Sequence, residues 1–439
     1  MSKKIVLITA FIVSLCVQQL YAQDSFCYTL GIDEMFRLAD ENSKSIRTFD
    51  TGIEQAKEGV KVAKNNMLPS IDAGLSFSYL GNGYITDRNF SNGLKAAIPH
   101  YGNNFSIDAS QVVYAGGAIS GGIAIAELQQ QIAELDKVNN QQDVRFLLIG
   151  YYMELYKLAN YAKVYTKNIE QTQKLLKDIR AKQKEGTALR NDITRYELQL
   201  KNLELQLTKV MNNRLIINHQ LITVLGLPKS ATIVPDTTIL QKELTISGVE
   251  DWQRMASSSL PSLRKMELGI DVSKQQETII KSEKLPHIAL VAANHLDGPV
   301  TIDIPAINKN FNYWYVGVGV KYNLASLYKT NKQYKQAKLA TRRAQEQLAL
   351  AKDMTENEIQ AAYTYYLESF TELNTQEKSL ELATQNYDVV NNRYLNDLAL
   401  ITDMLDASNS KLSAELQVAN ARINILYNYY KLKKASGNL

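Results

Sequence analysis

The sequence predicts an α+β fold made of two tandem copies of one unit, each with a long helical hairpin and two strands. Three observations support this: an internal repeat in constant register, two very long proline-free helical runs, and four segments with alternating apolar and polar residues. The predicted class is therefore tandem-duplicated long α-helical hairpins, with a four-strand contribution from each chain to a sheet.

The internal repeat is found by comparing the chain with itself. The matching ranges are 30–70 with 247–287 at an offset of 217, and 111–226 with 322–437 at an offset of 211. Leu68-Pro69 recurs as Leu285-Pro286, and Asp192 recurs as Asp403. The second offset is smaller than the first, so the change in length falls in one stretch, as expected of a loop.

The repeat also predicts where the parts of the chain lie. The first repeat is expected at 23–227, with one helix at 32–66, strands at 71–80 and 103–114, and a helical hairpin at 117–226. The second is expected at 248–439, with a helix, strands at 287–296 and 312–324, and a hairpin at 327–436. A linker or equatorial segment, 228–247, joins them.

The strands have the length and pattern of membrane β-barrel strands. In 71–80, Ile71, Leu75 and Phe77 point one way, and Asp72 and Ser76 point the other. Strands of about 9–11 residues span a bilayer, although a half-buried strand of a soluble sheet has the same pattern. Four antiparallel strands cannot close a barrel, and unpaired edges are not tolerated in lipid. A barrel therefore requires several chains, and three would supply twelve strands.

The helical runs are too long for a compact enzyme domain. No proline occurs from 117 to 184, and 184 − 117 + 1 = 68 residues would span about 100 Å at ~1.5 Å per residue. Helices of globular proteins average about 11–12 residues. Helices this long must pack against neighbours along most of their length.

The N-terminus has the features of a secretory signal peptide, expected at 1–22. Lys3 and Lys4 precede the apolar run Ile5–Cys16, and Leu20-Tyr21-Ala22 provides a cleavage site. Cys27 is then the only cysteine, so no internal disulfide is expected.

Composition and motifs give little support to other classes of function. The net charge of +4 is too small to indicate nucleic-acid binding. The four histidines show no HExxH spacing and no paired cysteines accompany them, so we expect no metal, no cofactor and no enzymatic activity.

Two carboxylates follow the turn of the second hairpin. Asp403 and Asp406 are three residues apart, so on a helix they share one face. Tyr394 precedes the same turn. Acids are ordinary near a helix N-terminus, and Tyr394 is equally explained as an aromatic residue between helices. On these residues alone both interpretations stay open.

The sequence resembles the TolC-like outer-membrane efflux proteins. The segments that carry the resemblance are Leu68-Pro69-Ser70-Ile71, Leu285-Pro286-His287-Ile288, Asp403-Met404-Leu405-Asp406-Ala407, Ala414 to Arg422, and Gly437. The likeness covers nearly the whole chain after the expected signal peptide.

The resemblance implies a homotrimer in the cell outer membrane, with a twelve-stranded β-barrel and a periplasmic α-barrel. It implies a passive exit duct of a tripartite efflux or type I secretion system, gated at its periplasmic tip. The implied partners are outer-membrane lipid, a periplasmic adaptor (membrane fusion) protein, and an inner-membrane pump of the RND, ABC or MFS type. Nucleic acid is not among them.

The resemblance also assigns roles to four residues. Asp403 and Asp406 match the family's pore aspartates, Tyr394 matches a tyrosine that holds the closed state, and Asp192 matches the partner of that tyrosine. The turn at 396–399 lacks the glycine and the basic residue that the family has there. The residues able to replace the basic one are Arg190, Arg195 and Arg393.

Two other functions are alternatives to a channel. A periplasmic coiled-coil adaptor or scaffold would use the helices without forming a pore. An exported hydrolase would need a compact catalytic domain, which the long helical runs do not predict.

Overall fold

The computed structural model describes residues 27–236, 247–303, 305–396 and 398–439. The expected signal peptide and most of the expected linker, 237–246, lie outside these residues. The chain divides into two compact units. Unit 1 comprises Met1–Asp50, Lys137–Pro261 and Lys352–Leu439, and unit 2 comprises Thr51–Asp136 and Ser262–Ala351. Each unit therefore combines segments from both repeats.

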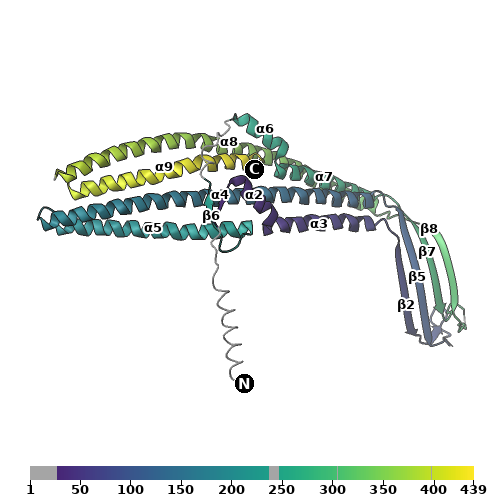
Figure 1. The fold of residues 1–439 in the computed structure, drawn as a ribbon. Coiled ribbons are helices and arrows are strands. Elements are labelled where there is room, and N and C mark those ends of the chain that lie inside the picture. The colour runs from purple at the N-terminus through teal and green to yellow at the C-terminus, as the bar shows by residue number, and fades with distance from the viewer. Residues whose placement is uncertain (1–26, 237–246, 304, 397) are drawn as a thin grey trace, which may run out of the picture. The chain divides into compact units, whose positions relative to one another are not determined.

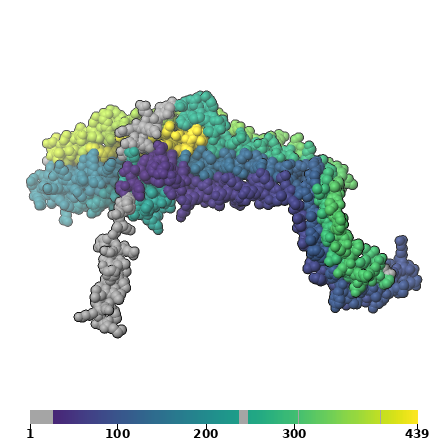
Figure 2. Space-filling view, turned by 45° about the vertical axis from the view of Figure 1, so that its right-hand side comes forward, coloured from purple at the N-terminus to yellow at the C-terminus, as the bar shows by residue number. Residues whose placement is uncertain are grey.

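The sheet of unit 2 contains the four strands that the sequence predicts. They are β2 (Ser70–Tyr79), β5 (Tyr101–Tyr114), β7 (His287–Gly298) and β8 (Phe311–Lys321). They pair antiparallel in the order β2-β5-β7-β8 and lie side by side in Figure 1. In Figure 2 the green surface of β7 and β8 lies beside the blue surface of β2 and β5. Strands β2 and β8 are the outer strands, so each has one edge that this sheet does not pair.

One side of the sheet exposes apolar residues on both outer strands. On β2, Ile71 is 69% exposed and Phe77 is 77% exposed. On β8, Trp314, Val316 and Val318 are between 65% and 73% exposed. Large apolar patches on a protein surface mark contact with lipid or another chain. Between β2 and β5, the short strands β3 (Gly83–Ile85) and β4 (Leu94–Ala96) form a hairpin.

The prediction of one helix over 32–66 is wrong, because the structure has two helices there. Helix α2 (Ile32–Asn42) ends at buried Ser43, whose backbone is extended, and α3 (Lys44–Asn65) follows. The second repeat has the same break at Leu260, between α6 (Val249–Ser259) and α7 (Pro261–Ser282). Pro261 explains that break, because proline cannot continue a helix and restricts the residue before it. No proline marks the break at Ser43.

The long helices form two hairpins. Helix α4 (Ala118–Lys184) returns as α5 (Arg190–Leu225), and α8 (Ser326–Leu395) returns as α9 (Ile401–Ala435). The members of each hairpin lie side by side in Figure 1. Among the described residues, none of the helices has an apolar stretch of the length and hydropathy needed to cross a bilayer.

Each returning helix is followed within two residues by a glycine that packs closely against another segment. Gly226 and Gly437, which are equivalent in the two repeats, have φ angles of 67° and 75°, which L-residues with a side chain rarely adopt. A Cβ atom at Gly226 would lie 2.8 Å from Cβ of Asn42, and one at Gly437 would lie 2.9 Å from Cα of Leu260. Each glycine therefore contacts the chain next to a helix break. The break at Ser43 thus coincides with a tertiary contact, whereas no helix-breaking residue marks it.

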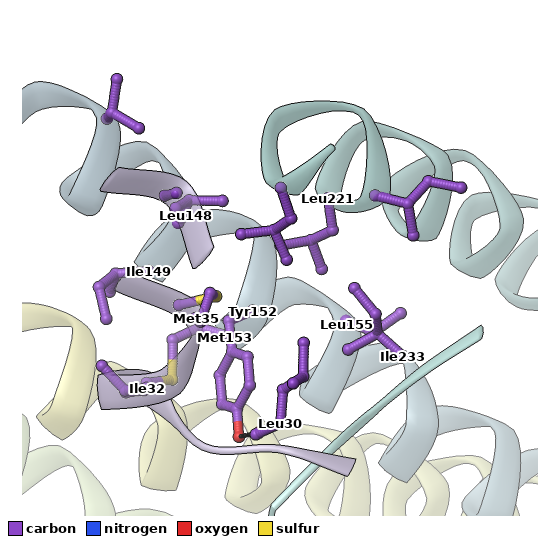
Figure 3. Close-up of a cluster of buried hydrophobic side chains, with 14 of the residues drawn as sticks. Leu30, Ile32, Met35, Leu148, Ile149, Tyr152, Met153, Leu155, Leu221 and Ile233 are labelled. Carbon is purple, nitrogen blue, oxygen red and sulfur yellow. Dashed lines mark hydrogen bonds between the residues drawn. The ribbon is translucent and has the colours of Figure 1, made fainter. Parts of the chain in front are cut away.

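The core of unit 1 forms where the two hairpins meet the short strands. Strands β1 (Cys27–Leu30) and β6 (Thr232–Pro235) pair in parallel, so part of the expected linker is a strand. Figure 3 shows the buried residues around them, including Leu30, Met35, Leu148, Leu155 and Ile233. A second buried cluster includes Trp252, Ile359, Tyr366 and Leu432.

Tyr152 connects this core to both short strands. Its hydroxyl donates a hydrogen bond to the Leu30 carbonyl at 2.8 Å and accepts one from the Asp236 backbone N–H at 2.8 Å. Burial raises the pKa of Tyr152 to about 12. The phenol therefore stays neutral, and it satisfies two backbone groups that would otherwise be buried beside an apolar core.

We expect Tyr152→Phe to lower the free energy of unfolding of unit 1 by about 1–3 kcal/mol, because two backbone groups lose their partner. The measurement is the urea midpoint of the helical circular dichroism signal of the full-length protein in detergent. Tyr84→Phe is the control, because Tyr84 is 75% exposed and should leave the midpoint unchanged. Equal midpoints for wild type and Tyr152→Phe would contradict the role of this hydroxyl.

Candidate functional site

The turns of the two hairpins lie together at one end of unit 1 (left in Figure 1) and form one groove. The groove has a volume of about 350 Å³ and is lined from both turns. Its lining includes Lys182, Asp192 and Arg195 from the first hairpin, and Tyr394 and Ile401 from the second. Two of the four residues singled out by the sequence, Asp192 and Tyr394, therefore face the same groove.

The two turns share one backbone hydrogen bond. The Thr187 N–H donates to the Lys182 carbonyl at 3.0 Å, and the Leu398 N–H donates to the Arg393 carbonyl at 2.8 Å. These bonds occupy equivalent positions in the two repeats, so the duplication extends to the way in which each long helix ends. Gly186 takes the left-handed conformation in the first turn, with a φ angle of 79°.

Asp192 and Asp403 stabilise the start of the returning helices. The Asp192 carboxylate accepts the Leu189 N–H at 3.0 Å, and the Asp403 carboxylate accepts the Leu400 N–H at 3.1 Å. Each aspartate is the third residue of its helix, where a carboxylate satisfies an N–H that has no helical partner. Leucine has no side-chain acceptor, so only this half of a capping box is made. Both aspartates therefore have a structural role.

Asp403 and Asp406 are exposed on one face of α9, while Met404 and Ala407 are buried on the other. This is the spacing expected when one face of a helix packs and the other does not. The structure thus places the two carboxylates outside the core of their own hairpin. Their role in a pore stays a prediction.

Tyr394 belongs to a buried cluster between the two hairpin ends. It is 9% exposed and is grouped with Leu176, Tyr196 and Met404. The cluster takes residues from α4, α5, α8 and α9, so it joins the two hairpins near their turns. The position fits a residue that holds the hairpin ends together.

Lys182 is a further residue of this site, and the sequence patterns do not single it out. Its ammonium lies 3.4 Å from the Leu395 carbonyl oxygen and 5.5 Å from the ring centre of Tyr394. A cation at this distance from a ring is attracted to its face. Lys182 therefore links the end of α4 to the end of α8. The available signal was its position: 182 + 211 = 393, so it is the counterpart of Arg393.

The three arginines proposed as substitutes occupy other positions. Arg393 donates to the Leu398 carbonyl at 3.3 Å within its own turn. Arg195 lines the groove, and Arg190 is the first residue of α5. Lys182, by contrast, reaches the ring of Tyr394.

Tyr196 is the most deeply buried tyrosine of the cluster between the two hairpin ends, at 2% exposure. Its hydroxyl has no hydrogen-bond partner among the described residues. Burial raises the pKa of Tyr196, and the nearby hydroxyls of Tyr394 and Tyr387 raise it further. A buried hydroxyl without a partner costs free energy, so the packed tip carries a local penalty.

Polar contacts continue between the hairpins above the tip. The Asn168 amide donates to Glu415 at 3.0 Å, and the Lys167 ammonium lies 3.3 Å from the other oxygen of that carboxylate. The Gln199 amide donates to Asn409 at 2.7 Å. The two hairpins are thus joined by polar contacts as well as by apolar packing.

Comparison with known proteins identifies the family. The model of the outer membrane efflux protein family matches residues 36–227 and 252–438. Outer membrane protein TolC of Salmonella enteritidis is 21% identical over 421 residues, which are 92% of this chain and 82% of that protein.

Solved outer-membrane proteins have the same fold. The outer-membrane channel OprN is 15% identical, with a TM-score of 0.75 over 93% of this chain and 90% of OprN. VceC of Vibrio cholerae is 16% identical, with a TM-score of 0.73 over 92% of this chain and 96% of VceC. These findings confirm the predicted family and fold. The chain belongs to the outer membrane efflux protein family and is an outer-membrane efflux channel with a large periplasmic helical portion.

Proposed function

We propose that three copies of this chain form the exit duct of a tripartite efflux or type I secretion system. The duct is a passive conduit without enzymatic activity of its own. A periplasmic adaptor protein joins it to an inner-membrane pump of the RND, ABC or MFS type, which supplies the energy. The family placement supports a channel and gives no support to the alternative of a periplasmic adaptor.

The observation that carries this proposal is the open four-stranded sheet. Its outer strands β2 and β8 expose apolar side chains and leave one edge each. An unpaired edge in lipid costs several kcal/mol for each unsatisfied backbone group. Pairing β8 of one copy with β2 of the next removes every edge. Three copies then supply 3 × 4 = 12 strands.

The helices carry exposed apolar residues that suit the same assembly. On α5, Leu198, Leu205 and Leu215 are 62%, 51% and 69% exposed. On α8, Leu382 and Val389 are 54% and 57% exposed. Long helices are stable only when such faces are covered. Neighbouring copies in a helical barrel supply that cover.

Around a threefold axis, Asp403 and Asp406 become six carboxylates. Both are exposed in one chain and lie near the hairpin turn. Rings of carboxylates make a constriction selective for cations and attract multivalent cations. We therefore assign these residues to the narrow end of the duct.

Lys182 and Tyr196 act in opposite directions on this end. Lys182 holds the end of α8 through the Leu395 carbonyl and the Tyr394 ring. Tyr196 is buried without a hydrogen-bond partner among the described residues, so loosening the tip lets its hydroxyl gain one. The tip can then have two states of similar free energy, which an adaptor can bias.

We expect Asp403→Asn with Asp406→Asn to reduce cation selectivity severalfold in planar-bilayer recordings and to weaken block by multivalent cations. Asparagine is used because its amide oxygen can still accept the Leu400 N–H, so the helix start is preserved. The reason is the loss of six negative charges from the constriction of the trimer.

Glu170→Gln with Glu368→Gln is the matched control. It removes the same number of charges from exposed positions farther from the turns. If both double variants have the cation selectivity of wild type, Asp403 and Asp406 do not line the constriction. A soluble monomer that forms no pore would overturn the duct itself.

Lys182→Met should raise the closed-state conductance and the uptake of antibiotics too large for porins. It removes a cation–π contact worth about 0.5–1 kcal/mol and a hydrogen bond from a charged donor. Lys182→Arg should keep the closed-state conductance and the antibiotic uptake close to those of wild type. Lys184→Gln removes a charge from the same helix end and should behave as wild type. If Lys184→Gln and Lys182→Met have equal effects, local charge and not this contact controls the tip.

Tyr196→Phe should leave the free energy of unfolding unchanged or raise it by up to about 1 kcal/mol, because it removes an unpartnered hydroxyl. Tyr152→Phe should lower it, because the Tyr152 hydroxyl donates a hydrogen bond to the Leu30 carbonyl at 2.8 Å. Both are measured as urea midpoints of the full-length protein.

The pH dependence gives a second readout for Tyr196. Its pKa is raised in the folded state, so unfolding releases a proton above the unfolded value of about 10. Wild type should therefore lose stability as pH rises above about 10, and Tyr196→Phe should lose less. If Tyr196→Phe is destabilised as much as Tyr152→Phe, the Tyr196 hydroxyl has a partner and does not oppose the packed tip.

A further inference from the structure

The segment after β8 joins the membrane sheet to a long periplasmic helix. Strand β8 ends at Lys321, and α8 begins at Ser326 (Figure 1). The helical portion of this outer-membrane channel is periplasmic, so this end of the sheet adjoins the periplasmic leaflet of the membrane. The first turns of α8 therefore start at the headgroups of that leaflet.

This part of α8 carries a run of basic residues, which we call the α8 basic run. From Ser326 to Gln345 the helix contains no aspartate or glutamate. All members of the run are exposed: Lys329, Lys332, Lys335, Lys338, Arg342 and Arg343. Among the described ion pairs of the run, only Arg342 has a carboxylate, that of Glu346 at 2.9 Å.

Helix stability does not explain the α8 basic run. Cations are unfavourable near a helix N-terminus, and like charges three residues apart repel one another. Helix α4 begins at the equivalent place in the first repeat and has no lysine or arginine before Lys137. A long helix can thus start at this sheet without basic residues. The neighbouring carboxylates of Glu277 in α7 and of Glu283 just after it accept hydrogen bonds from Thr341 and Thr330 of α8. No described ion pair joins either carboxylate to the run, so the run indicates a further anionic partner.

Exposed apolar and aromatic residues separate the strand from the basic run. Tyr322, Leu324, Leu327 and Tyr328 are between 41% and 67% exposed. Tyrosine beside lysine at the end of a membrane-spanning element is the composition of a membrane interface. Lysine clusters at this position attract anionic lipid, with about 1 kcal/mol for each cation near the surface.

A second copy of the chain is a poorer partner for the run. Because β2 and β8 are the outer strands, the neighbouring copy brings α3, which leads into β2. Helix α3 has five lysines and arginines and three acids, so its formal charge is 5 − 3 = +2. It cannot neutralise the basic run.

We propose that the start of α8 binds the phosphate groups of anionic phospholipids in the periplasmic leaflet of the outer membrane. Lys329 and Lys332, in the first two turns, make the closest contacts, and Tyr322 and Tyr328 lie at the level of the headgroups. The binding anchors the channel at this depth. It depends on the outer-membrane placement and not on the gate at the hairpin tips.

The position of each charge along α8 makes the test specific. Lys338 and Arg343 lie on average ten residues beyond Lys329 and Lys332, which is about 15 Å at ~1.5 Å per residue. This exceeds the Debye length of about 8 Å at physiological salt. A headgroup plane therefore interacts with the near pair more strongly than with the far pair, whereas an extended protein partner would contact both.

The experiment is native mass spectrometry of the purified full-length channel in detergent with equimolar phosphatidylglycerol and phosphatidylcholine. Wild type should bind phosphatidylglycerol severalfold better, and added salt should reduce the preference. Lys329→Gln with Lys332→Gln should remove most of it, and Lys338→Gln with Arg343→Gln should leave most of it. Lys329→Arg with Lys332→Arg should retain it.

The assembled mass in the same spectra shows whether each variant still forms the wild-type oligomer. No preference in wild type would overturn the proposal. Equal losses from the near and far pairs would also overturn it and would indicate a protein partner along the whole run. A near-pair variant that assembles and still prefers phosphatidylglycerol would exclude Lys329 and Lys332 as the lipid contacts.

Discussion

The open edges of the four-stranded sheet are the constraint on which the rest of this structure depends. Backbone N–H and C=O groups at a membrane depth must be paired, and one chain leaves β2 and β8 with an edge each. A second copy of the same chain supplies the missing hydrogen-bond partners, so no additional strand is needed. Once copies surround an axis, every residue of the hairpins acquires several equivalents, so a few exposed side chains become a ring.

The hairpin ends, far along the chain from the sheet, are polar as well as apolar. A permanent seal at the tip needs only a buried cluster such as the one around Tyr394 and Met404. This chain adds a lysine that reaches across the hairpin ends and a buried tyrosine without a described partner. In the gating that we propose, contacts of about 1 kcal/mol each leave the tip close to balance. A conduit that must open on contact with other components benefits from that balance.

The sequence was sufficient for features that depend on local pattern. Strand β2 follows from the alternation of apolar and polar residues and lies within a residue of its predicted range, and α4 coincides within a residue with the long helical run expected from 117 to 184. Aspartates three residues into α5 and α9 were visible as acids after a turn. Their capping bonds fit the general preference of helix N-termini.

Features that depend on contacts distant in sequence could not be predicted. Strands β1 and β6 are short and lie in different parts of the sequence, so neither has a local signal. Ser43 interrupts a helical pattern without a proline, beside the contact between Asn42 and Gly226. In the sequence, Lys182 resembles the other lysines of the long helices. What distinguishes it is its contact with Tyr394, which belongs to the other repeat.

Comparison of the two repeats separates the residues that shape the backbone from those that serve the assembled channel. Equivalent positions of the two repeats agree where the chain must turn, as at Asp192 and Asp403 or Gly226 and Gly437. They differ where one repeat has a task that the other lacks. Tyr196 is matched by Ala407, and the α8 basic run is matched by a stretch of α4 without a cation. A duplicated fold needs its turns twice, but the proposed gate residue and the proposed lipid contact are needed only once per chain, because the symmetry of the proposed assembly repeats them around the axis.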